Sequence, residues 1–265
     1  MIATTHRLVQ LSDLHLFASA HGRLLGQNTQ QTFAAVRAQV QSRHPDAAAY
    51  LITGDLMHDE GLTGYRYLQR DLQGIGVRCY CLPGNHDRVD LLATLIDPHN
   101  PKYLRVEAVG GWELILLDST IPGEDGGWLA AHDLAALDAY LSNQRERPVL
   151  VAMHHHPLAA GSRWLDQMII RNAPDLLAIL DRYPQVRALV WGHIHQQFDG
   201  QRGHYALLAT PSTCIQFLPA SPEFAIDTLT PGYRWIDLYA DGTINSGVER
   251  IAAYPDPLEL MALGY

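Results

Sequence analysis

The chain has 265 residues, of which 47% are apolar, and this is enough to bury the core of one α/β domain. Its 19 lysines and arginines against 28 aspartates and glutamates give a formal net charge of −9, which repels a nucleic-acid backbone and favours a small substrate. Three cysteines exclude a disulfide framework, and the sequence shows neither a signal peptide nor an apolar run of membrane-spanning length, so we expect a cytoplasmic protein with no membrane partner.

The first third of the chain alternates strand and helix patterns. Residues 7–12 form a short buried strand, and the helix that follows has Asn28 or Thr29 as its N-cap. A second strand is expected over 48–53, a second helix ends near Gly74, and a third strand covers 77–82. This alternation is typical of a largely parallel sheet with helices packed on it.

The rest of the chain continues the alternation and then changes character. Strands are expected over 113–117, 149–153, 186–191 and 205–209, with helices around 134–141 and 174–182. Asp241-Gly242 between two strand patterns predicts a tight hairpin that closes one edge with antiparallel strands. Residues 219–231 are expected to form a surface loop. We therefore expect a single domain over residues 1–265, with a core of about 6–250 and a C-terminal tail over 251–265.

Carboxylates and imidazoles recur just after five of the expected strands. The five clusters are Asp13-Leu14-His15, Gly54-Asp55, Gly84-Asn85-His86-Asp87, His154-His155-His156-Pro157 and Gly192-His193-Ile194-His195. Loops beyond the carboxyl ends of neighbouring strands converge on one crevice, so residues distant in sequence meet there. A glycine before Asp55, Asn85 and His193 lets the backbone turn sharply and approach a bound group closely.

This set of ligands predicts a metal centre. Aspartate oxygen and imidazole nitrogen suit zinc, iron and manganese, and there are more of them than one tetrahedral site can use, so two ions are implied. One carboxylate must then bridge the ions, and Asp55 is the candidate because it is the lone carboxylate of its cluster. Such a bridge would hold the ions roughly 3.5–4 Å apart.

The order of these motifs resembles that of the calcineurin-like metallophosphoesterases. The resemblance implies a four-layer αββα sandwich, with two mixed β-sheets flanked by helices, over nearly the whole chain. It also implies two divalent transition-metal ions, for which iron and manganese are expected and zinc is compatible. One ion would be held by Asp13, His15, Asp55 and His195, and the other by Asp55, Asn85, His154 and His193.

Further segments narrow the resemblance to the bacterial class III cyclic-AMP phosphodiesterases. They are residues 16–18, 25–29, 164–166, 171–173 and 209–214. The implied activity is hydrolysis of 3′,5′-cyclic AMP to 5′-AMP, with a metal-bridging hydroxide as nucleophile, which would lower intracellular cyclic AMP. The substrate would be bound by His15, Asn85, His86 and His195. The only partner expected is this small cyclic nucleotide, and the chain would be a monomer or a homodimer.

Two catalytic residues are expected, Asp55 as the bridging ligand and His86 as proton donor or electrostatic stabiliser. For Asp87, orientation of the His86 imidazole and a purely core electrostatic role are both open. Within the histidine triplet, His154 fits the family spacing best and His155 is the alternative ligand. Trp164 is open between packing and stacking on a base.

Two other functions stay open at this point. One is a phosphodiesterase for a different small diester, such as a 2′,3′-cyclic nucleotide or a glycerophosphodiester. The other is a metallophosphoesterase fold kept as a non-catalytic scaffold. Loss of catalysis would show as replaced ligands, and every expected ligand is present in the sequence.

Overall fold

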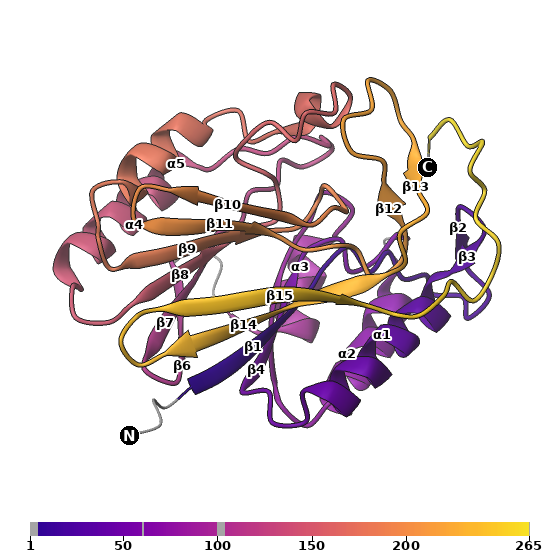
Figure 1. Ribbon diagram of the computed structural model, residues 1–265, viewed down its shortest axis with the longest axis horizontal. Coiled ribbons are helices and arrows are strands. Elements are labelled where there is room, and N and C mark those ends of the chain that lie inside the picture. The colour runs from indigo at the N-terminus through magenta and orange to yellow at the C-terminus, as the bar shows by residue number, and fades with distance from the viewer. Residues whose placement is uncertain (1–4, 60, 100–103, 265) are drawn as a thin grey trace.

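The structure, a computed structural model, describes residues 5–59, 61–99 and 104–264. Two mixed sheets pack face to face (Figure 1). The first has the strand order β15, β14, β1, β4, β5, in which β1, β4 and β5 run parallel and β14 and β15 are antiparallel. Its strands are β1 (Thr5–Leu11), β4 (Ala49–Thr53), β5 (Arg78–Leu82), β14 (Gly232–Tyr239) and β15 (Ile244–Arg250).

The second sheet has the strand order β10, β11, β9, β8, β7, β6. Its four central strands are parallel and its two edge strands are antiparallel to their neighbours. They are β6 (Arg105–Val109), β7 (Trp112–Leu116), β8 (Val149–Ala152), β9 (Val186–Trp191), β10 (Phe198–Arg202) and β11 (Tyr205–Ala209). Two small ribbons complete the strands: β2 (Arg23–Leu24) with β3 (Gln27–Asn28), and β12 (Gln216–Phe217) with β13 (Ile226–Asp227).

Helices cover the outer faces of both sheets. On the first sheet lie α1 (Thr29–Arg43), α2 (Leu62–Gln73), α3 (Val89–Leu91) and the π-helical η1 (Leu92–Ile96), and on the second α4 (Ala131–Asn143) and α5 (Ala173–Leu180). The 3₁₀ turn η2 (Leu165–Met168) follows the histidine triplet. One apolar cluster fills the space between the sheets, and two others lie under the helices. The expected αββα sandwich is therefore confirmed.

The principal strands and helices expected from the sequence are present, with ends shifted by a few residues. Asn28 caps α1 by accepting a hydrogen bond from the Gln31 N–H at 3.0 Å. The hairpin forms at Asp241-Gly242, where Gly242 has a φ of 83°. Edge strands β6 and β10 were not predicted, because half-exposed sequences such as that of β10 lack an apolar run. The expected loop over 219–231 contains the short strand β13.

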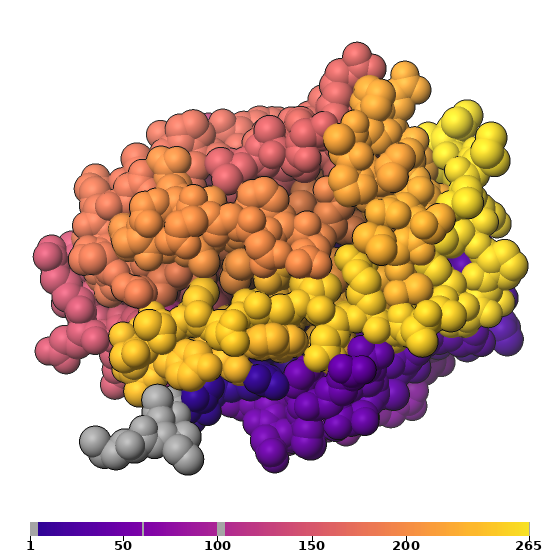
Figure 2. All heavy atoms as spheres, in the orientation of Figure 1, coloured from indigo at the N-terminus to yellow at the C-terminus, as the bar shows by residue number. Residues whose placement is uncertain are grey.

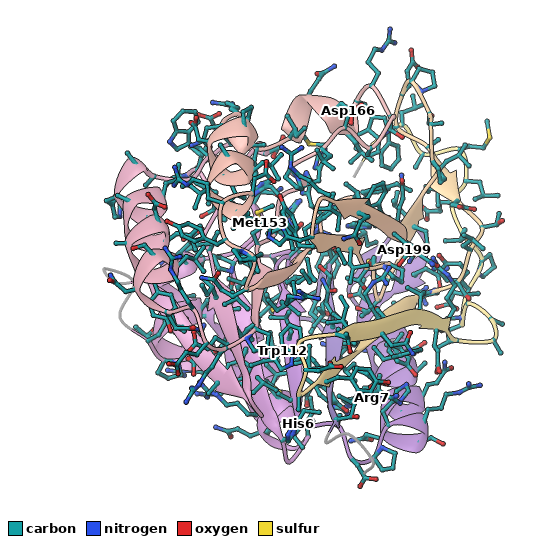
Figure 3. All side chains as sticks on the ribbon, turned by 60° about the vertical axis from the view of Figure 1, so that its left-hand side comes forward. His6, Arg7, Trp112, Met153, Asp166 and Asp199 are labelled. Carbon is teal, nitrogen blue, oxygen red and sulfur yellow. The ribbon has the colours of Figure 1, made fainter. Side chains whose placement is uncertain are left out.

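Contacts between distant segments close both ends of the sandwich. The indole N–H of Trp112 donates to the Tyr239 carbonyl at 2.8 Å and so joins the two sheets; Figure 3 labels it with His6 and Arg7 of the facing sheet. The C-terminal segment, yellow in Figure 2, extends along the right-hand side of the molecule. There the Gln27 amide donates to the Asp256 carbonyl at 2.7 Å. Among the described residues, no helix combines the length and apolar composition that crossing a membrane requires.

Candidate metal centre

The five motif clusters meet where the carboxyl ends of both sheets come together. Three clusters follow β1, β4 and β5 of the first sheet, and two follow β8 and β9 of the second. Neighbouring parallel strands end at the same edge, so the loops leave the sheets side by side. The ligands expected from the sequence all lie at this edge: Asp13, His15, Asp55, Asn85, His154, His193 and His195.

One set of ligands gathers around His15. The Nε2 atoms of His15 and His195 lie 3.2 Å apart. His195 Nε2 also lies 3.4 Å from Asp13 Oδ1, and His15 Nε2 lies 3.6 Å from Asp55 Oδ2. These four side chains are buried, so their donor atoms face one another rather than water.

A second set gathers around His154. Its Nε2 lies 3.1 Å from His193 Nδ1, 3.2 Å from Asn85 Oδ1 and 3.4 Å from Asp55 Oδ2. The same oxygen of Asp55 therefore faces both sets. This is the geometry expected of a carboxylate shared between two cations.

Hydrogen bonds from outside the two sets fix the ligand rings. The Nδ1 atoms of His154 and His195 lie 2.7 Å from the Thr53 carbonyl and 2.9 Å from the Ile215 carbonyl. A ring that donates through Nδ1 presents the lone pair of Nε2 to a metal, and such contacts to a second partner commonly orient histidine ligands. The Ser212 hydroxyl donates to the Asp13 carbonyl at 2.7 Å and holds that loop.

The ligand loops have an unusual backbone. Asp13, His15, Asp55, His193 and His195 all have positive φ, between 45° and 66°. This region costs non-glycine residues about 1–3 kcal/mol each, and such strain is concentrated at functional sites. A neighbouring glycine allows the close approach: a Cβ on Gly84 would lie 2.1 Å from Asp55 Oδ1. Gly84 therefore packs directly against the Asp55 carboxylate.

Burial and neighbouring charges shift the pKa values of the expected ligands. Burial lowers the pKa of His15 and His193 well below the usual value, so both rings are neutral. Burial opposes ionisation of Asp55, but the charge on His154 outweighs it and holds the pKa of this carboxyl well below its usual range. Burial also opposes protonation of His154, yet Asp55 raises its pKa to about 9. Asp55 is thus anionic at neutral pH.

His86 and Asp87 follow the ligand Asn85 and take different places. The His86 backbone N–H donates to Asp55 Oδ1 at 3.0 Å, and its half-buried ring lies with its centroid 4.9 Å from that of His15. The Asp87 carboxylate accepts hydrogen bonds from the backbone N–H groups of Gly84, Leu56 and Met57 and from the Tyr65 hydroxyl. Asp87 therefore joins the loops that carry Asp55 and Asn85. This supports a core role for Asp87 rather than orientation of the His86 imidazole.

His58 belongs to the site but was missed in the sequence. Its Nδ1 lies 3.4 Å from Nδ1 of His15, and its ring stacks on that of His86 with centroids 5.2 Å apart. Phe17 packs on His58 with centroids 4.8 Å apart. The signal was available, because His58 lies three residues after Asp55 in the same loop.

The structure separates the members of the histidine triplet, which follows Met153 (Figure 3). His154 faces the second ligand set. Nδ1 of His155 instead lies 2.8 Å from the Ser119 hydroxyl, and its Nε2 lies 3.2 Å from the Asp125 carbonyl. The His156 ring stacks on His193 with centroids 5.4 Å apart. The geometry therefore favours His154 over His155 as ligand.

Trp164, residues 210–213 and the cysteines all pack in the protein interior or at its margin. Trp164 packs its indole against Phe217 and Phe224, with ring centroids 4.9 and 5.2 Å apart, so packing accounts for it. The segment 210–213 is buried and supports the Asp13 loop through Ser212. The three cysteines are free thiols, of which Cys81 and Cys214 are buried and Cys79 is partly buried.

The donor chemistry fits divalent transition metals. The site brings together two carboxylates, an amide oxygen and four imidazoles. Their donor atoms lie as close as 3.1–3.2 Å, and a cation bound between them would make these close approaches favourable. His193 Nε2 has no hydrogen-bond partner among the described residues. Buried polar groups of this density are stable only when paired or bound to metal.

Comparisons with known proteins agree with this reading. A family model described as calcineurin-like phosphoesterase matches residues 6–197. The chain is 41% identical over 254 residues to the 3′,5′-cyclic adenosine monophosphate phosphodiesterase CpdA of Pseudomonas aeruginosa, with 92% of this chain and 89% of that protein covered. It is 39% identical to the CpdA of Escherichia coli K12, covering 93% and 90%.

Solved structures share the fold at low sequence identity. A dimetal phosphatase from Danio rerio aligns with a TM-score of 0.64 at 15% identity, over 92% of this chain and 98% of that one. A purple acid phosphatase from yellow lupin seeds aligns with the same score at 12% identity, over 94% and 54%. At these identities the likeness concerns the fold alone.

Proposed function

We propose, because this chain belongs to the calcineurin-like phosphoesterase family, that it is a metal-dependent phosphodiesterase that hydrolyses 3′,5′-cyclic AMP to 5′-AMP. The single observation that carries the proposal is identity of about 40% over nine-tenths of the chain to relatives named for that reaction. The convergence of every expected ligand supports it.

We assign two divalent ions to the two ligand sets, with Asp55 shared between them. Iron and manganese are the expected metals and zinc suits the same donors. Such ions activate a water at neutral pH and offset negative charge on the phosphate oxygens. Asp13, His15 and His195 would complete one set, and Asn85, His154 and His193 the other.

The chain itself provides an opening for the substrate and a residue that can donate a proton. Asn85 and His86 are partly exposed whereas the ligands around them are buried, so the phosphodiester approaches from the Asn85–His86 side. The water oxygen adds to phosphorus, the bond from phosphorus to the 3′ oxygen breaks, and the His86 imidazole donates a proton to this oxygen. The proton that the water releases then replaces the one that His86 gave up. The phosphate would contact His15, Asn85, His86 and His195 at this opening.

The test compares three diesters under one metal condition. Protein loaded with manganese or iron is assayed for kcat/KM with 3′,5′-cyclic AMP, 2′,3′-cyclic AMP and bis-p-nitrophenyl phosphate. We expect kcat/KM to be higher for 3′,5′-cyclic AMP than for 2′,3′-cyclic AMP. A value far below both alternatives would overturn the proposal in favour of another small diester. No turnover of any diester after metal loading would support a scaffold.

A further inference from the structure

A cavity of about 300 Å³ is lined in part by residues at and just after the ends of β5 and β7. We call it the Trp128 pocket, and its walls include Pro83, Leu92, Leu116, Asp118, Thr120 and Trp128. This volume lies at the lower end of the range for small-molecule sites. The metal ligands do not line it, so the metal chemistry leaves its role open.

The Trp128 pocket shares loops with the metal centre. Pro83 lies two residues before the ligand Asn85. On the other side, Ser119 follows Asp118, and the Ser119 hydroxyl lies 2.8 Å from His155 Nδ1. The His155 ring contacts that of His154 with centroids 4.9 Å apart. The contacts that lead from Asp118 to the ligand His154 therefore run through the buried residues Ser119 and His155.

The pocket combines apolar walls with a polar, aromatic rim. Leu92 and Leu116 are almost completely buried beneath it. Trp128 is 47% exposed, which leaves indole surface available, and its backbone N–H donates to the Ser119 carbonyl at 3.0 Å. Asp118 is exposed, and its Oδ1 accepts from the Thr120 N–H at 2.9 Å and the Thr120 hydroxyl at 2.7 Å. Both rim residues are thus held in place from the backbone.

A second cavity, of about 530 Å³, touches the ligand His195 but lies on its other side. The Phe217 ring stacks on the His195 ring at 4.0 Å and is itself buried, so it closes this cavity from the metal-facing atoms. His195 Nε2 points away from it, toward His15.

We propose that the Trp128 pocket binds the adenine base of the cyclic nucleotide, with the indole of Trp128 against the ring and the Asp118 carboxylate accepting a hydrogen bond from the 6-amino group. This inference rests on the proposed function, because the phosphate must lie at the metal ligands. Guanine carries a carbonyl oxygen at the same position, which would face the carboxylate as one acceptor against another. The pocket would thereby select adenine over guanine.

The test uses kinetics with 3′,5′-cyclic AMP, 3′,5′-cyclic GMP and methyl p-nitrophenyl phosphate, a diester without a nucleoside. Asp118→Asn can donate to guanine as well as accept from adenine, so the kcat/KM ratio of cyclic AMP to cyclic GMP should fall about tenfold. Trp128→Ala should raise KM for both nucleotides about tenfold by loss of stacking, with Trp128→Phe close to wild type. Asp175→Asn and Tyr67→Ala, exposed residues elsewhere, are the matched controls.

Methyl p-nitrophenyl phosphate distinguishes recognition from folding. Its turnover should be unchanged in all variants. An unchanged nucleotide ratio in Asp118→Asn, an unchanged KM in Trp128→Ala, or a parallel loss with methyl p-nitrophenyl phosphate would overturn the pocket assignment.

Product binding gives a readout without turnover. We expect 5′-AMP to quench the tryptophan emission of the wild type, and Trp128→Phe to lose that quench. If the wild type cleaves methyl p-nitrophenyl phosphate but not cyclic AMP, the proposed function fails. The fluorescence quench by 5′-AMP then tests on its own whether the Trp128 pocket binds adenine. A quench that persists in Trp128→Phe would overturn the assignment.

Discussion

The metal centre and the Trp128 pocket are built differently. The metal centre collects its expected ligands from loops that directly follow five strands, with positive φ at five positions and hydrogen bonds that orient the rings of His154 and His195. The pocket collects single residues from separate segments over an apolar floor. The first arrangement would determine which bond is cleaved, and the second would determine which substrates carry that bond.

This difference can be tested because the two regions should fail in different ways. Changes in the metal centre should slow every diester, whereas changes in the Trp128 pocket should affect nucleotides alone.

The largest effect is expected for Asp55→Ala. The Oδ2 atom of Asp55 faces both ligand sets, so its removal should lower metal content at both positions. Loss of metal activation should reduce kcat by at least about 10³-fold with nucleotide and non-nucleotide diesters alike. Elemental analysis and turnover measure this. A variant that kept two equivalents of metal would show that Asp55 is not the shared ligand.

Asn85→Ala and His86→Ala should separate metal binding from proton donation. Asn85→Ala removes a ligand of one set and should lower metal content there. His86→Ala should keep both metals but slow cyclic AMP turnover about 10²-fold, because the 3′ alkoxide needs a proton. Turnover of bis-p-nitrophenyl phosphate should fall much less, because its p-nitrophenolate leaves without needing a proton. Equal metal loss in the two variants would contradict these assignments.

His58→Ala should have an effect of about tenfold on kcat for cyclic AMP, because the stacked ring positions His86 and contacts His15. His58→Phe keeps the stacking surface and should recover part of the loss. The effect should be smaller with bis-p-nitrophenyl phosphate if His58 acts through His86. Equal loss with both diesters would place its action on the metal ligand instead.

The smallest effect concerns the thiols near the Trp128 pocket. Cys81 lies in its wall, and burial raises the pKa of this thiol well above its usual value. Burial raises the pKa of Cys79 to about 12. Thiolate is the reactive form, so native protein at pH 8 should react with iodoacetamide far more slowly than protein in urea. Rapid alkylation of Cys81 in the native state would show that the pocket opens.

The sequence predicted the metal centre better than the pocket for a physical reason. A ligand such as Asp13 or His195 lies in a motif at a strand end, and parallel strands bring such ends together. Trp128 carries no such pattern, and Asp118 follows the expected strand over 113–117 only as a lone carboxylate, so their proximity depends on how β7 and the loop after it pack. His58 was missed because it does not belong to a ligand motif; it contacts His15 and His86 instead.

The fold itself was predictable where apolar periodicity is strong. The buried parallel strands and long helices are apolar over several residues, whereas β10 alternates between half-exposed and exposed positions and gives no such signal. The positive φ values at the ligands could not be predicted either. Aspartate and histidine tolerate this region better than most residues, but nothing in the residue types requires it.

The strained ligand positions bear on how such a centre is lost. Glycine adopts positive φ at no steric cost, so a change of Asp13 or His193 to glycine removes the ligand and relieves the backbone together. Substitutions that relieve active-site strain commonly stabilise a protein while abolishing its activity. A duplicated gene freed from selection for catalysis would therefore gain stability as it lost its ligands, and an inert descendant of this fold is an accessible evolutionary outcome.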